Sequence, residues 1–216
     1  MRTDRDLVRS KAPWAFAVCM ASALLLWVGW CVLIVSVGEA FFSPAVHAFA
    51  SVAIVLVPAL IYLRSTGTRP DAMGLRYRWR RGVLVGFLFV ALEMAVLAYN
   101  STFDLSLVPT DIDVWLDSII LSPFAKELLF RRVAIDHLSK RHGPGIAILI
   151  SSLLLVAFDL TWLILSGDNH PVFIVGASVG LLIRELTCGV IYRWTRSLWS
   201  NLLPSCFGSF ADTIIV

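Results

Sequence analysis

The sequence predicts an all-α, polytopic membrane protein, a bundle of about seven transmembrane helices with a cytoplasmic N-terminus. Of its 216 residues, 58% are hydrophobic and 15% are charged, and the mean hydropathy is +0.82. Soluble domains of this length do not have such a composition. The apolar residues form runs of about 20, the length that a helix needs to cross ~30 Å of hydrocarbon. Lysine and arginine also alternate between successive connections, as they do in multi-pass proteins.

Seven apolar runs are long enough to cross the hydrocarbon. They cover about residues 13–37, 44–63, 82–99, 114–133, 145–165, 171–192 and 197–216. The first run is too long for the apolar part of a cleaved signal peptide and does not end in a small-residue cleavage site. We therefore expect it to remain in the mature protein.

The basic residues test this count independently, because cytoplasmic loops collect lysine and arginine. They precede the first run and follow the second, fourth and sixth, at Arg2, Arg5, Arg9, Lys11, Arg64, Arg69, Arg76, Arg78, Arg80, Arg81, Arg131, Arg132, Lys140, Arg141, Arg193 and Arg196. The other connections, 38–43, 100–113 and 166–170, and the C-terminus have none. The alternation predicts a cytoplasmic N-terminus and an external C-terminus. The net charge of +3 then reflects topology, and no nucleic-acid partner is expected.

Cysteine and histidine give no pattern typical of a metal or disulfide site. The cysteines are Cys19, Cys31, Cys188 and Cys206, and the histidines are His47, His137, His142 and His170. Their spacings match neither a zinc motif nor a disulfide framework, so we expect buried free thiols, no metal and no cofactor. The chain has no clear repeat and no low-complexity tract, which favours a single membrane domain over residues 1–216.

The segment Ser122-Pro-Phe-Ala-Lys126-Glu127-Leu-Leu-Phe130-Arg131-Arg132 places several charges in or beside the fourth apolar run. Each such charge costs roughly 2.5–3.5 kcal/mol on insertion scales, so intramembrane charges are functional candidates by default. Glu127 and Arg131 are spaced i, i+4 with the acid first, which favours an ion pair on one helix face. We expect this pair mainly to brace the helix.

Four segments together resemble the CPBP family of intramembrane proteases, which contains the CAAX prenyl endopeptidases and bacterial bacteriocin-processing or immunity relatives. Gly74-Leu75-Arg76 is similar to the family's entry to a span, and Lys126-Glu127-Leu-Leu-Phe130-Arg131 stands in place of Glu-Glu-x-x-Phe-Arg. Residues 141–154 resemble the lead into Phe-x-x-x-His, and residues 192–199 the turn before His-x-x-x-Asn. The resemblance covers residues 71–216, of which 112–216 hold the motif helices.

At the catalytic positions the sequence departs from the family. The resemblance implies that the first glutamate and the middle histidine activate water, while the last histidine and asparagine hold the oxyanion. These four positions, with the phenylalanine of the middle motif, fall on Lys126, Asp159, Ser205, Ser209 and Leu155. Glu127 and Arg131 keep their family identities. A charged lysine has only donors and cannot act as a base, and one lost oxyanion donor can cost about 10²–10³ in rate.

Lys126 is a cation where the family has a carboxylate, and Asp159 is an anion where the family has an imidazole. These opposite charges predict an ion pair between two spans. This pair is either a structural salt bridge or a reworked acid/base pair in which Asp159 or Glu127 is the base. In a third alternative, one or both of Lys126 and Asp159 occupy solvated positions that face a loop. A Ser205–Lys126 dyad is conceivable, although no Gly-x-Ser-x-Gly elbow surrounds the serine. An alignment shifted by one residue would place Glu127 at the first-glutamate position and Arg132 at the arginine position. We reject this alignment because it would move Phe130 off its motif position.

Further intramembrane charges occur at Glu93, Arg184, Glu185 and Asp212, and we expect them to form internal pairs that support packing. Gly176-x-x-x-Gly180 permits a close helix approach but is too common in spans to indicate an activity.

Two functions compete. The first is an intramembrane endopeptidase of glutamic type, in which Glu127 and Asp159 provide acid/base chemistry and Ser205 and Ser209 bind the oxyanion. The second is a catalytically inactive pseudoprotease that binds a membrane peptide or protein for sorting or immunity. A transporter or channel is a weaker third, because the charges cluster at the protease motifs. The expected partners are the lipid bilayer and a membrane protein or peptide, in the bacterial inner membrane. The resemblance implies a peptidase, whereas the substitutions at the motif positions favour reduced or lost activity.

Overall fold

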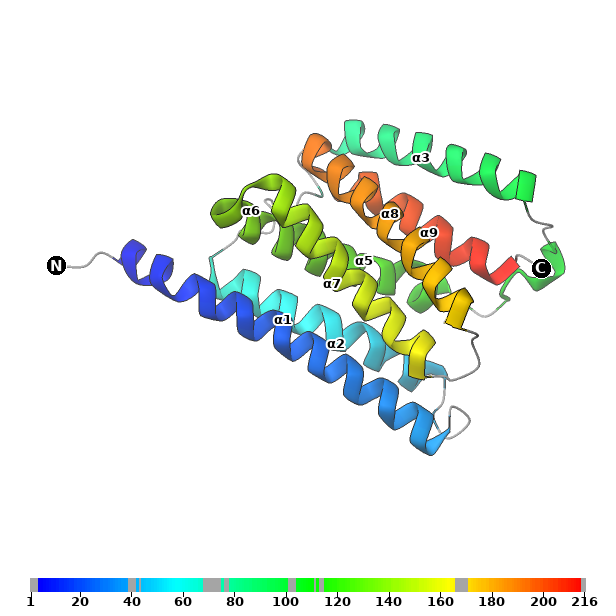
Figure 1. Ribbon diagram of the computed structural model, residues 1–216, viewed down its shortest axis with the longest axis horizontal. Coiled ribbons are helices and arrows are strands. Elements are labelled where there is room, and N and C mark those ends of the chain that lie inside the picture. Colours follow the sequence, from blue (N-terminus) through cyan, green and yellow to red (C-terminus); the bar gives the residue numbers. More distant parts are fainter. Residues whose placement is uncertain are drawn as a thin grey trace.

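The described part of the chain is built of helices and contains no strand, as predicted (Figure 1). A computed structural model describes residues 4–38, 42, 44–67, 75, 78–100, 104–110, 112, 115–165 and 171–214. Its long helices are α1 (Asp4–Val37), α2 (Pro44–Ser65), α3 (Trp79–Asn100), α7 (Pro144–Leu165), α8 (Pro171–Thr195) and α9 (Trp199–Ile214). A short 3₁₀ turn, η3 (Leu105–Leu107), follows α3.

A continuous helical rod from Trp115 to His142 occupies the middle of the bundle. It consists of η4 (Trp115–Leu121), α5 (Ser122–Glu127), η5 (Leu128–Ile135) and α6 (Asp136–His142), and η4 and η5 are π-helical. The residues at its inner junctions keep right-handed helical dihedrals, and Gly143 with φ of 80° ends the rod. Leu128, Leu129 and Phe130 are fully buried. The rod that carries the first motif is therefore a core element, and π turns of this kind often occur at functional sites.

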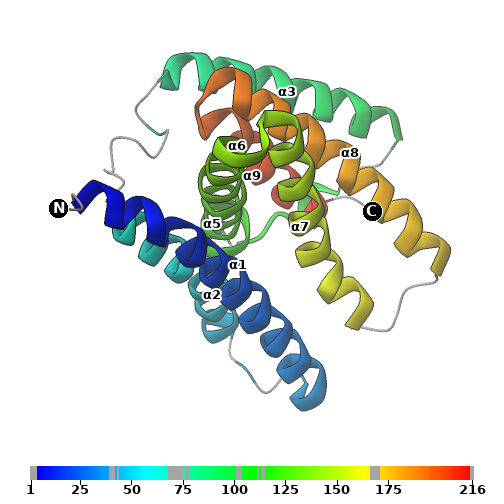
Figure 2. The ribbon, with the colours of Figure 1, turned by 60° about the vertical axis from the view of Figure 1, so that its left-hand side comes forward.

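The other helices enclose the rod on two sides. Helices α1 and α2 pack against each other on one side, α3 packs along α9 on the other, and α7 and α8 pack together between them (Figures 1 and 2). The rod contacts α2, α7, α8 and α9. Three helices that carry candidate residues, α7, α8 and α9, therefore all touch the element that carries Lys126 and Glu127.

Glycines at three positions allow helices to approach closely. A Cβ atom on Gly86 of α3 would lie 2.8 Å from the carbonyl oxygen of Trp199 on α9, and one on Gly189 of α8 would lie 2.6 Å from a methyl carbon of Ile148 on α7. A Cβ atom on Gly82 would collide with Ser197. Gly176 and Gly180 have nothing within 4 Å of such an atom. The G-x-x-x-G pattern thus marks no close approach among the described residues.

Four of the seven predicted runs form helices that are long and apolar enough to span a membrane: Pro13–Val37, Trp79–Tyr99, Pro144–Leu165 and Pro171–Thr195, counted over the described residues. In α2 the apolar helix is the shorter stretch Phe49–Ser65, and the fourth run lies in the mixed π and α rod. The seventh run forms α9, whose 16 residues extend about 24 Å at 1.5 Å per residue. Arg196, with φ of 57°, separates α9 from α8 and limits its length.

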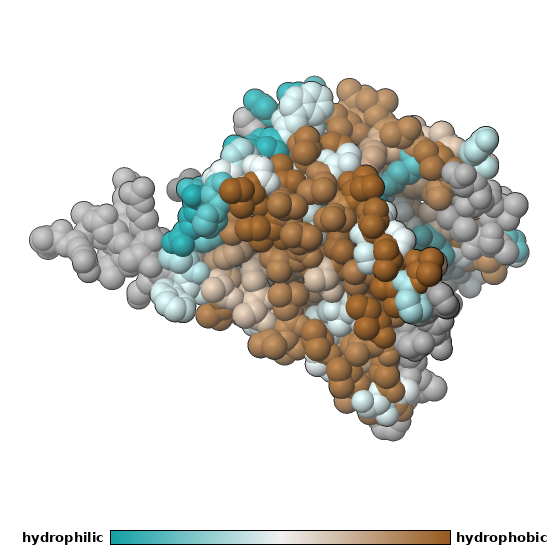
Figure 3. Space-filling model, viewed as in Figure 1, coloured by the Kyte–Doolittle hydropathy of each residue, from teal (hydrophilic) through white to brown (hydrophobic). Residues whose placement is uncertain are grey.

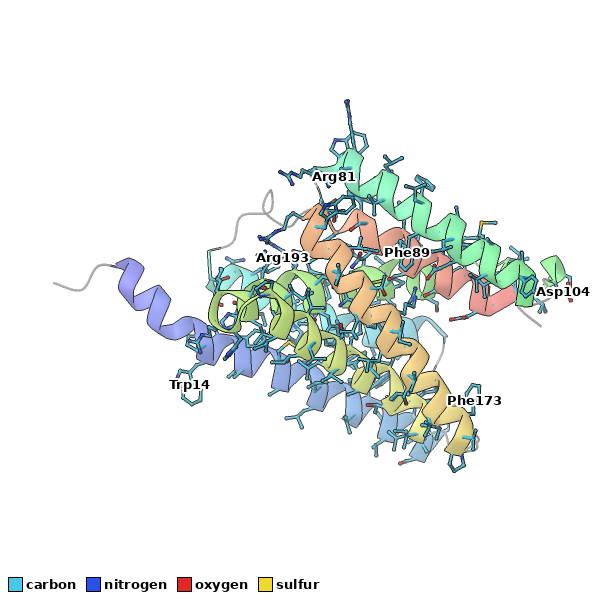
Figure 4. The ribbon with its side chains drawn as sticks, turned by 45° about the horizontal axis from the view of Figure 1, so that its top comes forward. Trp14, Arg81, Phe89, Asp104, Phe173 and Arg193 are labelled. Carbon is cyan, nitrogen blue, oxygen red and sulfur yellow. The ribbon has the colours of Figure 1, made fainter. Side chains whose placement is uncertain are left out.

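The basic connections gather at one end of the bundle. Figure 4 shows Arg81 and Arg193 toward the end where α1 begins, and Asp104 and Phe173 toward the opposite end. In Figure 3 hydrophilic residues gather toward the end where α1 begins, whereas the helices between the two ends present an apolar surface. This arrangement agrees with the charge alternation in the sequence. The orientation of the two ends across a membrane stays a prediction.

Candidate functional site

The rod directs the two charged residues of its first motif to different neighbours. Successive helical residues are about 100° apart around the axis. Lys126 reaches Asp159 on α7, whereas Glu127 contacts Arg131 on the rod and Ser205 on α9. The candidate residues therefore form two clusters. We call Lys126 and Asp159 the pocket pair, and Glu127, Arg131, Glu185 and Ser205 the buried network.

The pocket pair is a direct ion pair. Lys126 Nζ donates to Asp159 Oδ1 at 2.7 Å, and the two side chains are 30% and 23% exposed. The ammonium also lies 5.7 Å from the ring centroid of Phe158, within the ~6 Å range of a cation–π contact. The predicted pairing of Lys126 with Asp159 is confirmed, and the alternative of solvated loop positions is wrong, since both residues lie on half-buried helix faces.

A pocket of about 240 Å³ opens beside this ion pair. Its lining consists of Lys126, Asp159 and Trp162 together with Trp27, Trp30, Cys31 and Ile34 of α1. Trp27 holds α1 against α7, because its indole Nε1 donates to the carbonyl oxygen of Phe158 at 2.9 Å and its ring stacks on Phe158 at 4.4 Å. Helix α1 thus forms one wall of the site.

Sequence reasoning missed this wall. The available signal was the spacing of Trp27, Trp30, Cys31 and Ile34, which places them at i, i+3, i+4 and i+7 on one helix face. The spacing identifies a face but not the helix that the face contacts. The family resemblance gave no further indication, because it begins only at residue 71.

Arg131 is the centre of the buried network. Its side chain is 0% exposed, its Nη2 pairs with Glu185 Oε2 of α8, and its Nε lies 3.4 Å from Glu127 Oε2. Ser205 Oγ of α9 donates to Glu127 Oε1 at 2.9 Å. The predicted Glu127–Arg131 pair is confirmed, but Glu185, which was not predicted as its partner, makes the hydrogen bond. Arg131 Nη1 and Glu127 Oε2 have no hydrogen-bond partner among the described residues.

Arg184 extends the network toward α3 and α9. Its Nη1 lies 3.6 Å from Glu185 Oε1, its Nε pairs with Glu93 Oε1 at 3.2 Å, and its Nη2 donates to the carbonyl oxygen of Pro204 at 3.2 Å. The predicted internal pairing is confirmed for Glu93, Arg184 and Glu185. Asp212 lies exposed on α9 and forms no ion pair within 4 Å among the described residues.

The serines at the oxyanion positions lie on α9. Ser205 is hydrogen-bonded to Glu127, while Lys126 is bonded to Asp159, so the Ser205–Lys126 dyad does not form. Ser209 lies one turn further along and is half-buried. The complete burial of Phe130 and Arg131 also supports the motif register over the one-residue slip, because Arg132 is partly exposed and pairs with Asp136, the first residue of α6.

No imidazole reaches either cluster among the described residues. His137 on α6 lies against α1 and α2, where its Nδ1 is 2.7 Å from the Tyr62 hydroxyl and its ring stacks on Phe16 at 4.2 Å. Burial, and then the charges of Arg141, Lys140 and His142, lower the pKa of His137 below its usual range. His142 is exposed, whereas the side chain of His47 and all of His170 lie outside the described residues.

The same part of the chain holds no group of three His, Cys, Asp or Glu side chains that could bind a metal ion. The cysteines are free thiols; Cys19, Cys31 and Cys188 are buried and Cys206 is half-buried.

Residues 109–204 match the sequence model of the family described as type II CAAX prenyl endopeptidase Rce1-like. The match confirms the resemblance to CPBP proteases, and its segment includes Lys126, Glu127, Arg131 and Asp159 and ends one residue before Ser205. None of the curated proteins and none of the solved structures matches the chain. Together with the four span-length helices, the match supports a similarity of this chain to CPBP-type peptidases of the membrane.

Proposed function

We propose that this protein binds a membrane-presented peptide in the pocket between α1, α5 and α7 without cleaving it, as a pseudoprotease. The single observation that carries the proposal is the Lys126–Asp159 ion pair at 2.7 Å. It stands at the two positions where the family resemblance places the glutamate and histidine that activate water.

A general base must be able to accept a proton from water within hydrogen-bond distance. The Lys126 ammonium has three donors and no acceptor, and it holds Oδ1 of Asp159. Glu127 cannot readily replace Asp159, because its Oε1 accepts from Ser205 and its Oε2 faces Arg131 at 3.4 Å. One oxygen of each of these two carboxylates is therefore engaged, Asp159 Oδ1 by the ammonium and Glu127 Oε1 by a hydroxyl.

The oxyanion side of the site supports the same conclusion. Stabilisation of a tetrahedral intermediate needs donors that already point to the developing charge. The Ser205 hydroxyl directs its hydrogen to Glu127, and this contact lies in the buried network, on another side of the rod from the pocket pair. A peptide carbonyl held at Lys126 would not meet this donor in its observed orientation.

The pocket has the groups that peptide binding requires. After its bond to Asp159, the Lys126 ammonium keeps two N–H donors and Asp159 Oδ2 remains an acceptor. A donor and an acceptor side by side match the C=O and N–H of an extended peptide, and Trp27, Trp30 and Trp162 can enclose an apolar side chain. At about 240 Å³ the pocket is smaller than the roughly 300–1,000 Å³ sites of drug-sized ligands, so it suits one side chain and its peptide unit.

Hydrolysis can be tested with the full chain in nanodiscs, incubated with apolar membrane peptides that carry a fluorophore and a quencher. We expect no turnover above that of empty nanodiscs. Turnover that disappears in Glu127→Ala or Asp159→Asn would overturn the pseudoprotease proposal and favour the endopeptidase. The quadruple variant Lys126→Glu, Asp159→His, Ser205→His, Ser209→Asn restores the residue types of the family motifs. It tests whether the peptide set contains a cleavable sequence.

Binding can be tested separately by photo-crosslinking the same peptides. A photoreactive residue at Ile34, which lines the pocket, should crosslink, while one at Leu25, a 72% exposed position of α1, should not. Lys126→Met should remove the crosslink at position 34. Equal crosslinking from both positions would show general contact with the bundle surface and would contradict binding in the pocket.

The second candidate function, a residual endopeptidase, is favoured by the 2.9 Å contact between Ser205 and Glu127, which brings a predicted oxyanion donor to the retained glutamate. The hydrolysis experiment with Glu127→Ala decides between the two functions.

A further inference from the structure

A second charged feature lies where α3 begins and α8 ends, at the basic end of the bundle. The guanidinium carbon of Arg81 lies 4.1 Å from the ring centroid of Trp194, well within the ~6 Å range of a cation–π contact. Arg81 is exposed, and so is 59% of Trp194. Arg193 precedes the tryptophan in α8, and Figure 4 shows it at the same end as Arg81. We call Arg81, Trp194 and Arg193 the stacked-arginine site.

The packing of α3 fixes the position of the stack. Gly82 follows Arg81 directly and lies against Ser197, and Gly86, one turn later, lies against Trp199. The indole Nε1 of Trp199 donates to the carbonyl oxygen of Leu75 at 2.9 Å. These contacts hold the start of α3 against the turn between α8 and α9, and therefore hold the arginine over the tryptophan.

The charges of this site have no ion-pair partner in the part of the chain that the structure describes. No ion pair within 4 Å reaches Arg80, Arg81 or Arg193 among the described residues. Arg80 lies 5.5 Å over the ring of Trp79, which is 49% exposed. Exposed tryptophans beside arginines are typical of the membrane–water interface, where the rings lie at the level of the lipid headgroups.

We propose that the stacked-arginine site binds the phosphate of an anionic phospholipid. Stacking on Trp194 orders the guanidinium and leaves its N–H fork free, and this fork matches the oxygens of a phosphate in a bidentate arrangement. With the predicted N-terminus inside, the site faces the cytoplasmic leaflet, whose anionic lipids attract juxtamembrane cations. The inference is independent of peptide binding, since none of these residues lines the pocket.

The experiment uses the full chain in nanodiscs of equal parts phosphatidylglycerol and phosphatidylcholine, and native mass spectrometry measures the ratio of the two lipids retained on the protein. Arg81→Gln should lower the preference for phosphatidylglycerol about tenfold, as expected for one charge-assisted contact. Trp194→Leu keeps the charge and removes the stack, and should lower the preference roughly threefold or more.

Arg64→Gln is the matched control, because Arg64 is an exposed arginine in the last turn of α2 at the same end of the bundle. It should change the ratio less than about twofold, as expected for an exposed charge outside the site. Equal losses in Arg64→Gln and Arg81→Gln would show a diffuse attraction to the leaflet and overturn the site, as would an unchanged ratio in Trp194→Leu. Displacement of phosphatidylglycerol by added inorganic phosphate would indicate a site for soluble phosphate instead of lipid.

Discussion

At the scale of single residues, Arg131 is the position on which the interior charges converge. A guanidinium that is 0% exposed cannot be hydrated by bulk water, so its charge must be balanced by protein groups. Glu185 and Glu127 supply this balance from α8 and from the rod itself. Both carboxylates are only 3% exposed and share Arg131 as a cation, while Glu185 also lies 3.6 Å from Arg184.

Replacement of Arg131 should therefore destabilise the protein strongly. Arg131→Met removes the cation that two buried carboxylates share and leaves Glu185 only its longer contact with Arg184. We expect the free energy of unfolding to fall by about 3–5 kcal/mol. Denaturant unfolding in detergent, followed by tryptophan fluorescence, measures the change. Arg132→Met is the control: its pair with Asp136 is partly exposed and should cost about 1 kcal/mol or less. Equal losses in the two variants would contradict the central role of Arg131.

His137 should make stability depend on pH. Its pKa is lowered in the fold by burial and by Arg141, Lys140 and His142, so below about pH 6.5, the usual histidine value, the unfolded state binds more protons than the folded state. Stability should then fall as pH decreases from about 6.5 through the lowered pKa. In thermal unfolding, His137→Gln should flatten this dependence. The exposed His142→Gln should leave it in place, and the same slope in His137→Gln as in the parent would refute the assignment.

The sequence could predict the pocket pair but not the partner of Arg131. Aligning two motifs brought Lys126 and Asp159 to the positions of the glutamate and histidine that, by the resemblance, activate water together, and their opposite charges then predicted a contact. No motif covers Glu185, and the spacing between residues 131 and 185 does not tell which face of α8 meets the rod. The i, i+4 rule identified Glu127 as a neighbour of Arg131, because that contact is local.

At the scale of the elements, α3 depends on α9 more than on any other helix. It is mostly exposed over its length, and Gly82 and Gly86 allow its backbone to approach Ser197 and Trp199. Small residues at such positions allow the close van der Waals packing that drives helix association in a bilayer. The same contacts hold Arg81 at Trp194.

A side chain added between α3 and α9 should weaken the packing of α3 against α9. In Gly86→Ala the added methyl group would lie 2.8 Å from the backbone oxygen of Trp199, so we expect a loss of about 1–3 kcal/mol from overpacking. Gly29→Ala, at a position with nothing within 4 Å, should be neutral or stabilise by up to about 1 kcal/mol. Denaturant unfolding of both variants provides the comparison. A loss in Gly29→Ala as large as in Gly86→Ala would show that alanine destabilises these helices for another reason.

The apolar runs predicted the positions of the helices better than the residues at which the helices end. Each predicted run corresponds to helical segments, because burying apolar side chains in lipid requires satisfied backbone groups whatever the neighbours are. The length of α9 depends instead on a single residue, Arg196 with φ of 57°, and the π turns of the rod depend on packing around it. Neither feature leaves a periodic signal in the sequence.

At the scale of the whole molecule, the two charged clusters and the basic end divide the bundle into zones. The pocket pair opens to a pocket on the α1 side, and the buried network joins the rod to α8, α9 and α3. Arg80 and Arg81, which form no ion pair with any described residue, lie where α3 begins. The adjacency of Lys126 and Glu127 in the sequence conceals this division, since the rod directs them to different helices. We propose that the protein kept the fold of a peptidase while its former catalytic positions became a binding pair and a structural network.

The distribution of basic residues predicts which end of the bundle faces the cytoplasm, and cysteine labelling can test it. His142 ends α6 at the basic end, and Thr110 lies in a connection without lysine or arginine; both are exposed. Because cytoplasmic loops collect basic residues, a membrane-impermeant maleimide should label Thr110→Cys in intact cells and His142→Cys only after the cells are opened.

The background should carry Cys206→Ser, because Cys206 is the half-buried native thiol while the other three cysteines are buried, and this parent should remain unlabelled. The reverse pattern would place the N-terminus outside and move the stacked-arginine site to the external leaflet. Labelling of both positions in intact cells would contradict the separation of the two ends by a membrane. The expected pattern would place the pocket pair within the membrane, because the rod carries Lys126 between these two positions.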